Sequence, residues 1–539
     1  MGIKHFFYWW KTNFKQHIHN VSKDDKLRDK DINIDTLLLD LNGIFHKSAQ
    51  KIFKYGSSSE NNSLLTNNKA IIENNSENRI LVYKDICESI SGLIHISQPS
   101  KSVVLCIDGP APRSKQYQQR QRRFTPGRDT DSEFDSNCIT PGTIFMDELS
   151  NYIKSYLKHN KSTKSEWKGL DLVFSDEKVP GEGEHKAINY IKKHGMDDET
   201  FCINGPDADL IMLALATHKQ NFFILRDDMY SIDNDFFCID IKKCNVDLLK
   251  KLKWDSKEHI FDNKTVIDDF IFICFLVGND FLPHIPSIEI IKDGIELMID
   301  IYKEVCKVNG HFTYKTNKLK TRINLKSFKV FMNVIGMFEK QNFEEKVVSR
   351  CFPDKLLEKF IQATEPNVTL DINGYINQYN KEKFNDDIQN TCHKYIQGLH
   401  WVLTYYTESV PCWNWYFEYQ YAPMASEICK YVDTYKQPRY GNTKPSLPFV
   451  QLLSVLPPSS HKLIAEPLRS ILTDPPSSIK SFFPDEIKVD ISGKRKEWEG
   501  ITRVPMIDVK KVKNEYSKRK HNISLIDQKR NVLNNDIHI

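Results

Sequence analysis

Seven acidic residues follow apolar runs in the first 300 residues of the chain, and together they could bind metal ions. They are Asp40 after TLLL, Asp108 after SVVLCI, Glu182 and Glu184 in GEGEH, Asp207 and Asp209 in GPDADL, and Asp280 after FICFLVGN. Carboxylates gathered at one edge of a sheet would repel one another unless cations lay among them. Carboxylate oxygen suits Mg²⁺ or Mn²⁺, and two such ions can promote hydrolysis of a phosphodiester.

The surrounding elements should bring these carboxylates together. Short β-rich apolar runs alternate with longer segments, which predicts an α/β domain with a mostly parallel sheet. The expected strands are Thr36–Leu39, Val103–Ile107, Leu172–Phe174, Phe201–Ile203 and Phe222–Leu225, and the expected crossover helices lie near Val82–Ile96 and Glu184–Lys193. In open α/β sheets ligands bind beyond the carboxyl ends of the strands. A single Asp after a strand is more often a turn or capping residue, so the prediction depends on the coincidence of several.

A basic segment follows Asp108 directly. It contains six basic residues between positions 113 and 128 and no acidic residue until Asp129. Lys115, Gln119, Arg122 and Arg123 are spaced as one face of a helix, which could hold a terminal phosphate while the next phosphodiester lies over the metals. The alternative is an ordinary solvated helix face.

Three aromatic residues could stack on a nucleotide base. His46 lies six residues after Asp40, and Trp413 and Trp415 belong to the aromatic segment CWNWYF. Packing in the core is the competing interpretation for each of them. The residues themselves do not choose between the two tryptophans.

Composition excludes several classes of protein. Mean hydropathy is −0.49, there is no apolar run near 18 residues, and the N-terminus lacks a signal core. Twelve cysteines without CxxC spacing predict neither a disulfide framework nor a zinc site. We therefore expect a soluble intracellular protein, in the cytoplasm rather than the nucleus, with no membrane partner. The net charge of only +4 does not by itself predict a polyanion partner.

The chain divides by composition into four segments. We expect an α/β unit over 1–300, a variable helical linker over 301–385, a second, mainly helical region over 386–510 that packs on the first, and a basic, disordered tail over 511–539. The Ser- and Asn-rich stretch 57–78 is expected to be a surface insertion.

Several long motifs resemble the Xrn-type 5′-to-3′ exoribonucleases. They include MGIKHFFYW, LLLDLNGIFH, IDGPAPRSKQYQQRQRRF, VPGEGEHK, DADLIMLAL and VGNDFLPHIP, with YIQGLHWVLTYYTESVPCWNWYFEYQYAP and SFFPDEIKVDISGKRKEWEG further on. They cover nearly all of 1–300 and about 390–510. Two departures are Lys4, where the family usually has Pro, and Pro206 before the DAD pair.

The resemblance implies a PIN/FEN-like nuclease domain buttressed by the second region. The seven carboxylates would be the metal ligands and the catalytic residues. Lys115, Gln119, Arg122 and Arg123 would form a 5′-phosphate pocket, and His46 would stack on the first base against Trp413 or Trp415. Asp268 and Asp269 are not counted as ligands but could lie behind them.

The expected function is processive 5′-to-3′ hydrolysis of single-stranded RNA with a 5′-monophosphate, using two Mg²⁺ or Mn²⁺ ions and releasing mononucleotides. The enzyme is expected to act as a monomer. One alternative is a structure-specific 5′ DNA exonuclease or flap endonuclease, which is disfavoured because no Gly-rich helix–hairpin–helix segment is seen. The other is an inactive RNA-binding scaffold, which would be expected to have lost some of the seven acidic residues.

Overall fold

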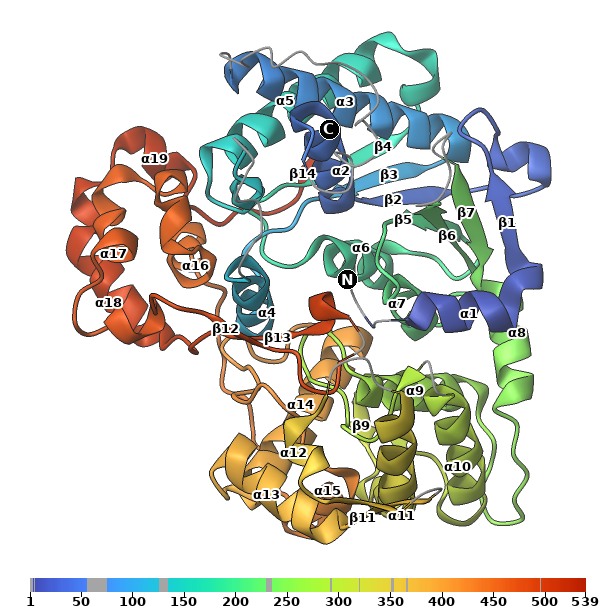
Figure 1. Ribbon diagram of the computed structural model, residues 1–539. Coiled ribbons are helices and arrows are strands. Elements are labelled where there is room, and N and C mark those ends of the chain that lie inside the picture. The colour runs from blue at the N-terminus through green and yellow to red at the C-terminus, as the bar shows by residue number, and fades with distance from the viewer. Residues whose placement is uncertain are drawn as a thin grey trace.

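The computed structural model describes residues 3, 5–55, 75–125, 134–228, 235–290, 293–318, 320–349, 353–364, 367–494 and 496–539. Its centre is an eight-stranded sheet in the order β1-β7-β6-β5-β2-β3-β4-β14 (Figure 1). The strands are β1 Ile18–Val21, β2 Thr36–Asp40, β3 Ser102–Cys106, β4 Asp171–Ser175, β5 Thr200–Asn204, β6 Asn221–Asp227, β7 Phe236–Asp240 and β14 Ile537–His538.

The five middle strands of this sheet are parallel to one another. β6, β5, β2, β3 and β4 pair in parallel, whereas β7 and β1 at one edge and β14 at the other pair antiparallel. β2 and β3 are buried along their whole length, as expected of strands covered on both faces. The five expected strands are confirmed to within two residues at each end, and with them the expected mostly parallel sheet.

Helices cover both faces of the sheet. One face packs on α2 Asn42–Phe53, α3 Asn75–Ser97 and α5 Ile144–Thr163. The other packs on α1 Phe6–Phe14, α6 Gly183–His194, α7 Leu210–Ala216 and α8 Ile241–Lys251, and α9 Asn263–Cys274 lies against α7 and α8. α3 and α6 confirm the two expected crossover helices. The buried helix α9 and a following 3₁₀ turn, Phe275–Val277, lead to Asp280.

A helical layer lies below this second face (Figure 1). It contains α10 Gly294–Asn309, α11 Leu325–Ser349, α12 Lys355–Glu358, α13 Ile372–Phe384, α14 Ile388–Thr407 and α15 Ala425–Tyr431, with the hairpins β8 Thr313–Lys315/β9 Thr321–Ile323 and β10 Ile361–Thr364/β11 Asn367–Leu370. α10, α11 and α14 share one continuous apolar core with the sheet. The two layers therefore form a single packed unit around the strand ends.

A third cluster of elements surrounds α4 Arg113–Arg123. It contains α16 Pro448–Val455, α17 Ser470–Thr473, α18 Val509–Arg519 and α19 Leu525–Lys529, with the hairpin β12 Lys488–Asp490/β13 Ile501–Arg503. Its core includes Phe124, Phe449, Leu453 and Val512. The basic helix α4 is thus enclosed between this cluster and the rest of the protein (Figure 1).

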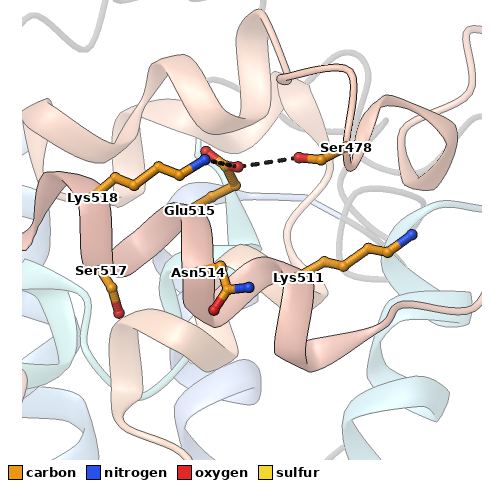
Figure 2. Close-up of a pocket in the computed structure, with 6 residues that line it drawn as sticks. All are labelled: Ser478, Lys511, Asn514, Glu515, Ser517 and Lys518. Atoms are coloured by element: carbon orange, nitrogen blue, oxygen red, sulfur yellow. Dashed lines mark hydrogen bonds and ion pairs between the residues drawn. The ribbon is translucent and has the colours of Figure 1, made fainter.

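Residues 511–539 are not a disordered tail, so that prediction is wrong. Within α18, Glu515 accepts hydrogen bonds from Ser478 and Lys518 beside a surface pocket that Figure 2 shows. At the end of the segment, β14 pairs with β4. The basic residues misled the composition argument because their neighbours Val512 and Tyr516 are buried.

The other expected segment borders fall at different places in the fold. The border at 385 lies in the turn between α13 and α14, whereas those at 300 and 510 lie inside α10 and α18. Of the expected insertion 57–78, residues 57–74 lie outside the described residues and the rest begin α3, and Lys4 also lies outside them. Among the described residues, no helix has the length and apolarity needed to cross a lipid bilayer.

Candidate active site

The carboxyl ends of the parallel strands gather most of the predicted acidic residues. Asp40 ends β2, Asp108 follows β3, and Asp207 and Asp209 follow β5. Glu182 and Glu184 begin α6, which follows β4. Asp280 comes from the loop after α9. Because parallel strands end at the same edge, residues far apart in the chain meet there.

Three of these carboxylates lie within metal-binding reach of one another. One oxygen each from Asp40, Asp108 and Glu184 fall within 4.8 Å, and Glu182, Glu184 and His185 form a second such group. Gly183 fits between them because a Cβ there would lie 2.5 Å from Asp40 Oδ1. Its backbone N–H donates to Asp108 Oδ1 at 2.7 Å. The missing side chain of Gly183 therefore lets the backbone come close to the carboxylates.

Burial and the charges of neighbouring carboxylates raise the pKa of three members of the cluster. Burial, then Asp108 and Asp207, raise the pKa of Asp40 well above its usual range. Burial and Glu182 likewise raise the pKa of Glu184. Burial together with Asp207 and Asp280 raises the pKa of Asp209 to about 7. These influences link all seven predicted carboxylates in one electrostatic cluster.

Lys115 from α4 supplies positive charge inside this cluster. Its Nζ lies 2.6 Å from Glu182 Oε2 and 2.7 Å from Asp280 Oδ2. Although burial favours the neutral carboxylic acid, Lys115 holds the pKa of Asp280 below its ordinary value. The helix expected to bind phosphate therefore also neutralises two of the acidic residues.

The donor set fits hard divalent cations. Asp40 Oδ1 and Asp209 Oδ1 are buried and have no hydrogen-bond partner among the described residues. Buried carboxylate oxygens without partners are costly, and a cation would satisfy them. Oxygen ligands dominate the set, which is the preference of Mg²⁺ and Mn²⁺.

The second predicted group lies on α4, and the helix is confirmed. Gln119 and Arg123 are buried, and Arg122 is half-buried. On another side of the helix, Arg113 and Arg120 are buried, and Arg120 donates to the carbonyls of Ser454, Pro505 and Phe482. The alternative of an ordinary solvated face is therefore wrong for this helix.

The aromatic candidates separate by burial. Trp415 is 8% exposed and stacks on Trp401 with ring centroids 5.2 Å apart, so it belongs to the core. Trp413 is half-buried, and its carbonyl accepts the N–H of Arg113 at the start of α4. His46 is half-buried on α2. Of the two tryptophans, only Trp413 therefore has a partly accessible side chain.

Two family models together match almost the whole chain. The model described as the XRN 5′-3′ exonuclease N-terminus matches residues 1–132 and 126–228, and that of the Xrn1 helical domain matches 260–365 and 356–539. The chain belongs to the Xrn family of 5′–3′ exoribonucleases. The sheet confirms the α/β fold class with a mostly parallel centre, and the membership confirms an enzyme of the hydrolase class.

Curated relatives of this Xrn chain include enzymes from animals. A 5′-3′ exoribonuclease 2 homolog of Drosophila melanogaster is 28% identical over 95% of this chain and 70% of its own length. The 5′-3′ exoribonuclease 2 of Gallus gallus is 26% identical over 100% of this chain and 72% of its own length. The 5′-3′ exoribonuclease 1 of Homo sapiens is 27% identical over 98% of this chain but only 35% of its own length.

Among solved structures, the catalytic core of Rad2 in complex with a DNA substrate is similar over 64% of this chain and 80% of that chain. Its TM-score is 0.31 and its identity 15%, which is too weak a likeness to support an argument.

Three site residues of this Xrn chain were not predicted. Tyr405 donates to Glu182 Oε1 at 2.8 Å and Tyr406 to Asp209 Oδ2 at 3.4 Å, both from α14. The ring of His185 stacks on that of Tyr405 with centroids 3.6 Å apart, and burial lowers the pKa of His185 well below its usual range. The signal was a pair of tyrosines in an apolar helix, where a phenol hydroxyl needs a partner.

Two acidic residues suggested to stand behind the ligands have other partners. Asp268 pairs with His218 and Lys315, and Asp269 accepts hydrogen bonds from Thr313 and Tyr302. They connect α9 to α10 and the β8 hairpin, which is a structural role.

Proposed function

We propose that this Xrn chain removes mononucleotides from the 5′ end of single-stranded RNA that carries a 5′-monophosphate, using two Mg²⁺ or Mn²⁺ ions. One observation carries the proposal: a cluster of seven carboxylates, four of them buried and three half-buried, lies directly against a helix whose Lys115, Gln119, Arg122 and Arg123 can bind phosphate. Acidic and basic groups so arranged could hold cations and the phosphates of one substrate side by side.

The seven carboxylates are the proposed metal ligands. Bound cations would activate water and stabilise charge on the leaving oxygen. The chain's own groups prepare this site, because the Tyr405 and Tyr406 hydroxyls orient Glu182 and Asp209. Lys115 balances the charge of Glu182 and Asp280 when fewer cations are present.

The 5′-phosphate pocket proposed on α4, formed by Lys115, Gln119, Arg122 and Arg123, would select the end group of the RNA. Arg122 and Arg123 offer guanidinium donors to a terminal phosphate, and Gln119 offers an amide. The neighbouring Gln119 and Gln451 side chains are buried, so a cap or triphosphate would have to displace packed groups. His46 and Trp413 are proposed to stack on the first base, which would place the scissile bond one nucleotide from the pocket.

An end-group assay tests this proposal. With Mg²⁺, 5′-monophosphate RNA should decay much faster than the same RNA with a 5′-triphosphate, and mononucleotides should accumulate. Equal decay of the two would refute the pocket. Faster cutting of flap DNA would instead favour the endonuclease, and metal-independent RNA binding without turnover would favour the scaffold.

Asp207→Asn tests the metal role, since it removes a charged ligand while keeping the shape of the side chain. Cleavage should fall by about a hundredfold to a thousandfold, on the scale of losing a main electrostatic contribution to catalysis. Undiminished cleavage would remove Asp207 from the mechanism.

Processive action by a monomer in the cytoplasm is part of the same proposal. Processivity predicts that, with excess RNA, individual molecules are degraded completely while others stay intact. Sedimentation tests the monomeric state, and imaging of a tagged chain tests the cytoplasmic location.

A further inference from the structure

A buried lysine joins the elements that carry the ligands. Lys186 lies on α6, one turn after Glu182, and its side chain is buried. Its Nζ donates to the backbone carbonyls of Ile107 at 2.6 Å and Asp176 at 2.8 Å, and to those of Ser175 and Val179 at 3.2 Å each. Four carbonyl oxygens thus surround one ammonium that has three protons, much as oxygens surround a bound cation.

These carbonyls belong to the segments that lead to the ligands. Ile107 precedes Asp108, Ser175 ends β4, and Asp176 and Val179 lie in the loop that leads from β4 to Glu182. One charged group therefore connects the ends of two adjacent strands, the loop and the start of α6.

The same loop is held closely against β3 by its backbone. Gly109 N–H donates to the Gly181 carbonyl at 2.8 Å, and Gly181 N–H donates to the Pro110 carbonyl at 3.1 Å. A Cβ on Gly109 would lie 1.8 Å from the Val179 oxygen, so only glycine permits this approach. Two backbone hydrogen bonds are weak restraints for a loop beside repelling carboxylates, and the buried ammonium adds a stronger, charged one.

We propose that Lys186 is a positioning residue of the metal site: its ammonium acts as a built-in structural cation that fixes Asp108, Glu182 and Glu184 in the geometry that binds divalent ions. This inference rests on the proposed function. Lys186 does not contact substrate or metal in this role. Its effect should therefore fall on metal affinity and much less on the binding of RNA.

The test compares Lys186→Met with Lys219→Met. Lys219 is a matched control because its Nζ also binds a backbone carbonyl, that of Gly195, but before β5 and away from the carboxyl ends of the strands. Mn²⁺ binding is measured by calorimetry well below each variant's unfolding temperature. Lys186→Met should weaken Mn²⁺ binding by about 10- to 100-fold, the usual effect of removing a group that orients metal ligands, and Lys219→Met should bind like wild type.

Kinetics provide the second readout. For Lys186→Met the Mg²⁺ concentration for half-maximal cleavage should rise at least about tenfold, while KM for 5′-monophosphate RNA at saturating Mg²⁺ stays within about twofold. A merely structural lysine would lower the unfolding temperature without changing the metal affinity of the folded molecules. Wild-type Mn²⁺ affinity in Lys186→Met would overturn the proposal.

A conservative variant keeps the test decisive if Lys186→Met does not fold. Lys186→Arg keeps the charge, but a planar guanidinium cannot reach all four carbonyls. Its Mn²⁺ affinity should fall severalfold, and an unchanged affinity would also overturn the proposal. If wild type neither binds Mn²⁺ nor cleaves RNA, the proposed function fails; if wild type does both and the variants match it, only the role of Lys186 fails.

Discussion

At the scale of single residues, some of the proposed metal-binding carboxylates oppose folding when no metal is bound. Asp40 illustrates this, since burial and the charges of Asp108 and Asp207 raise its pKa well above the ordinary value. A carboxyl group whose pKa is raised in the folded state contributes stability below its unfolded pKa. That stability is lost as the pH rises toward the folded pKa. Ionised Asp40 therefore lowers the free energy of unfolding of the metal-free protein at pH 8. Bound divalent cations would offset this loss.

Asp40→Asn should consequently stabilise the metal-free protein. In EDTA at pH 8 we expect its free energy of unfolding to rise by about 1–2 kcal/mol, with little difference at pH 4. Thermal unfolding with and without Mg²⁺ measures this, and the variant should gain less from Mg²⁺ than wild type. Asp171→Asn, at the opposite end of a strand, is the control. A lower unfolding temperature for Asp40→Asn in EDTA would contradict the prediction.

At the scale of elements, α4 has two faces with different tasks. Arg120 binds three carbonyls of the surrounding cluster, whereas Arg122 lies near enough to Asp280 to lower the pKa of that carboxyl. Arg120→Met should cost about 2–4 kcal/mol of stability because it leaves buried carbonyls without a donor. Arg122→Met should keep the unfolding temperature and raise KM for 5′-monophosphate RNA. Similar effects of both variants on KM and on unfolding would contradict this division.

Glu339 connects α11 to α15 and gives this contact a pH dependence. It accepts hydrogen bonds from the Ala425 N–H and the Ser426 hydroxyl, and burial raises its pKa to about 7. Its contribution to stability should be full below about pH 4.5 and should decline as the pH rises to about 7. Glu339→Gln should flatten that part of the stability curve, measured by urea unfolding between pH 5 and 8. The exposed Glu345→Gln on the same helix is the control.

At the scale of the whole molecule, the C-terminal segment completes the sheet. β14 pairs with β4, and Ile537 contacts the core while His538 is exposed. Ile537→Asp should lower the free energy of unfolding by about 2–3 kcal/mol, because it places a charge against apolar side chains. His538→Asp should change it by less than about 0.5 kcal/mol. Equal unfolding midpoints for the two variants would show that this strand does not stabilise the sheet.

Sequence patterns predicted local structure well where the pattern was strong. The apolar runs around Leu37 and Val103 gave the parallel strands, because strands buried on both faces need continuous apolar residues. The acidic residues after those runs were predicted to meet, because parallel strands end at one edge. Weak patterns misled: the basic residues after 510 suggested disorder, whereas their buried neighbours place the segment in the fold.

What the sequence alone determined was therefore the class of fold, the family resemblance and the carboxylates of the site. The tertiary structure decided which groups complete that site. Tyr405 reaches Glu182 across 223 residues, Lys115 lies between two acidic residues, and Trp415 is in the core while Trp413 is half-buried. Local periodicity records which face of an element is buried, but not which distant element covers it. Contacts between remote segments are fixed only when the whole chain packs.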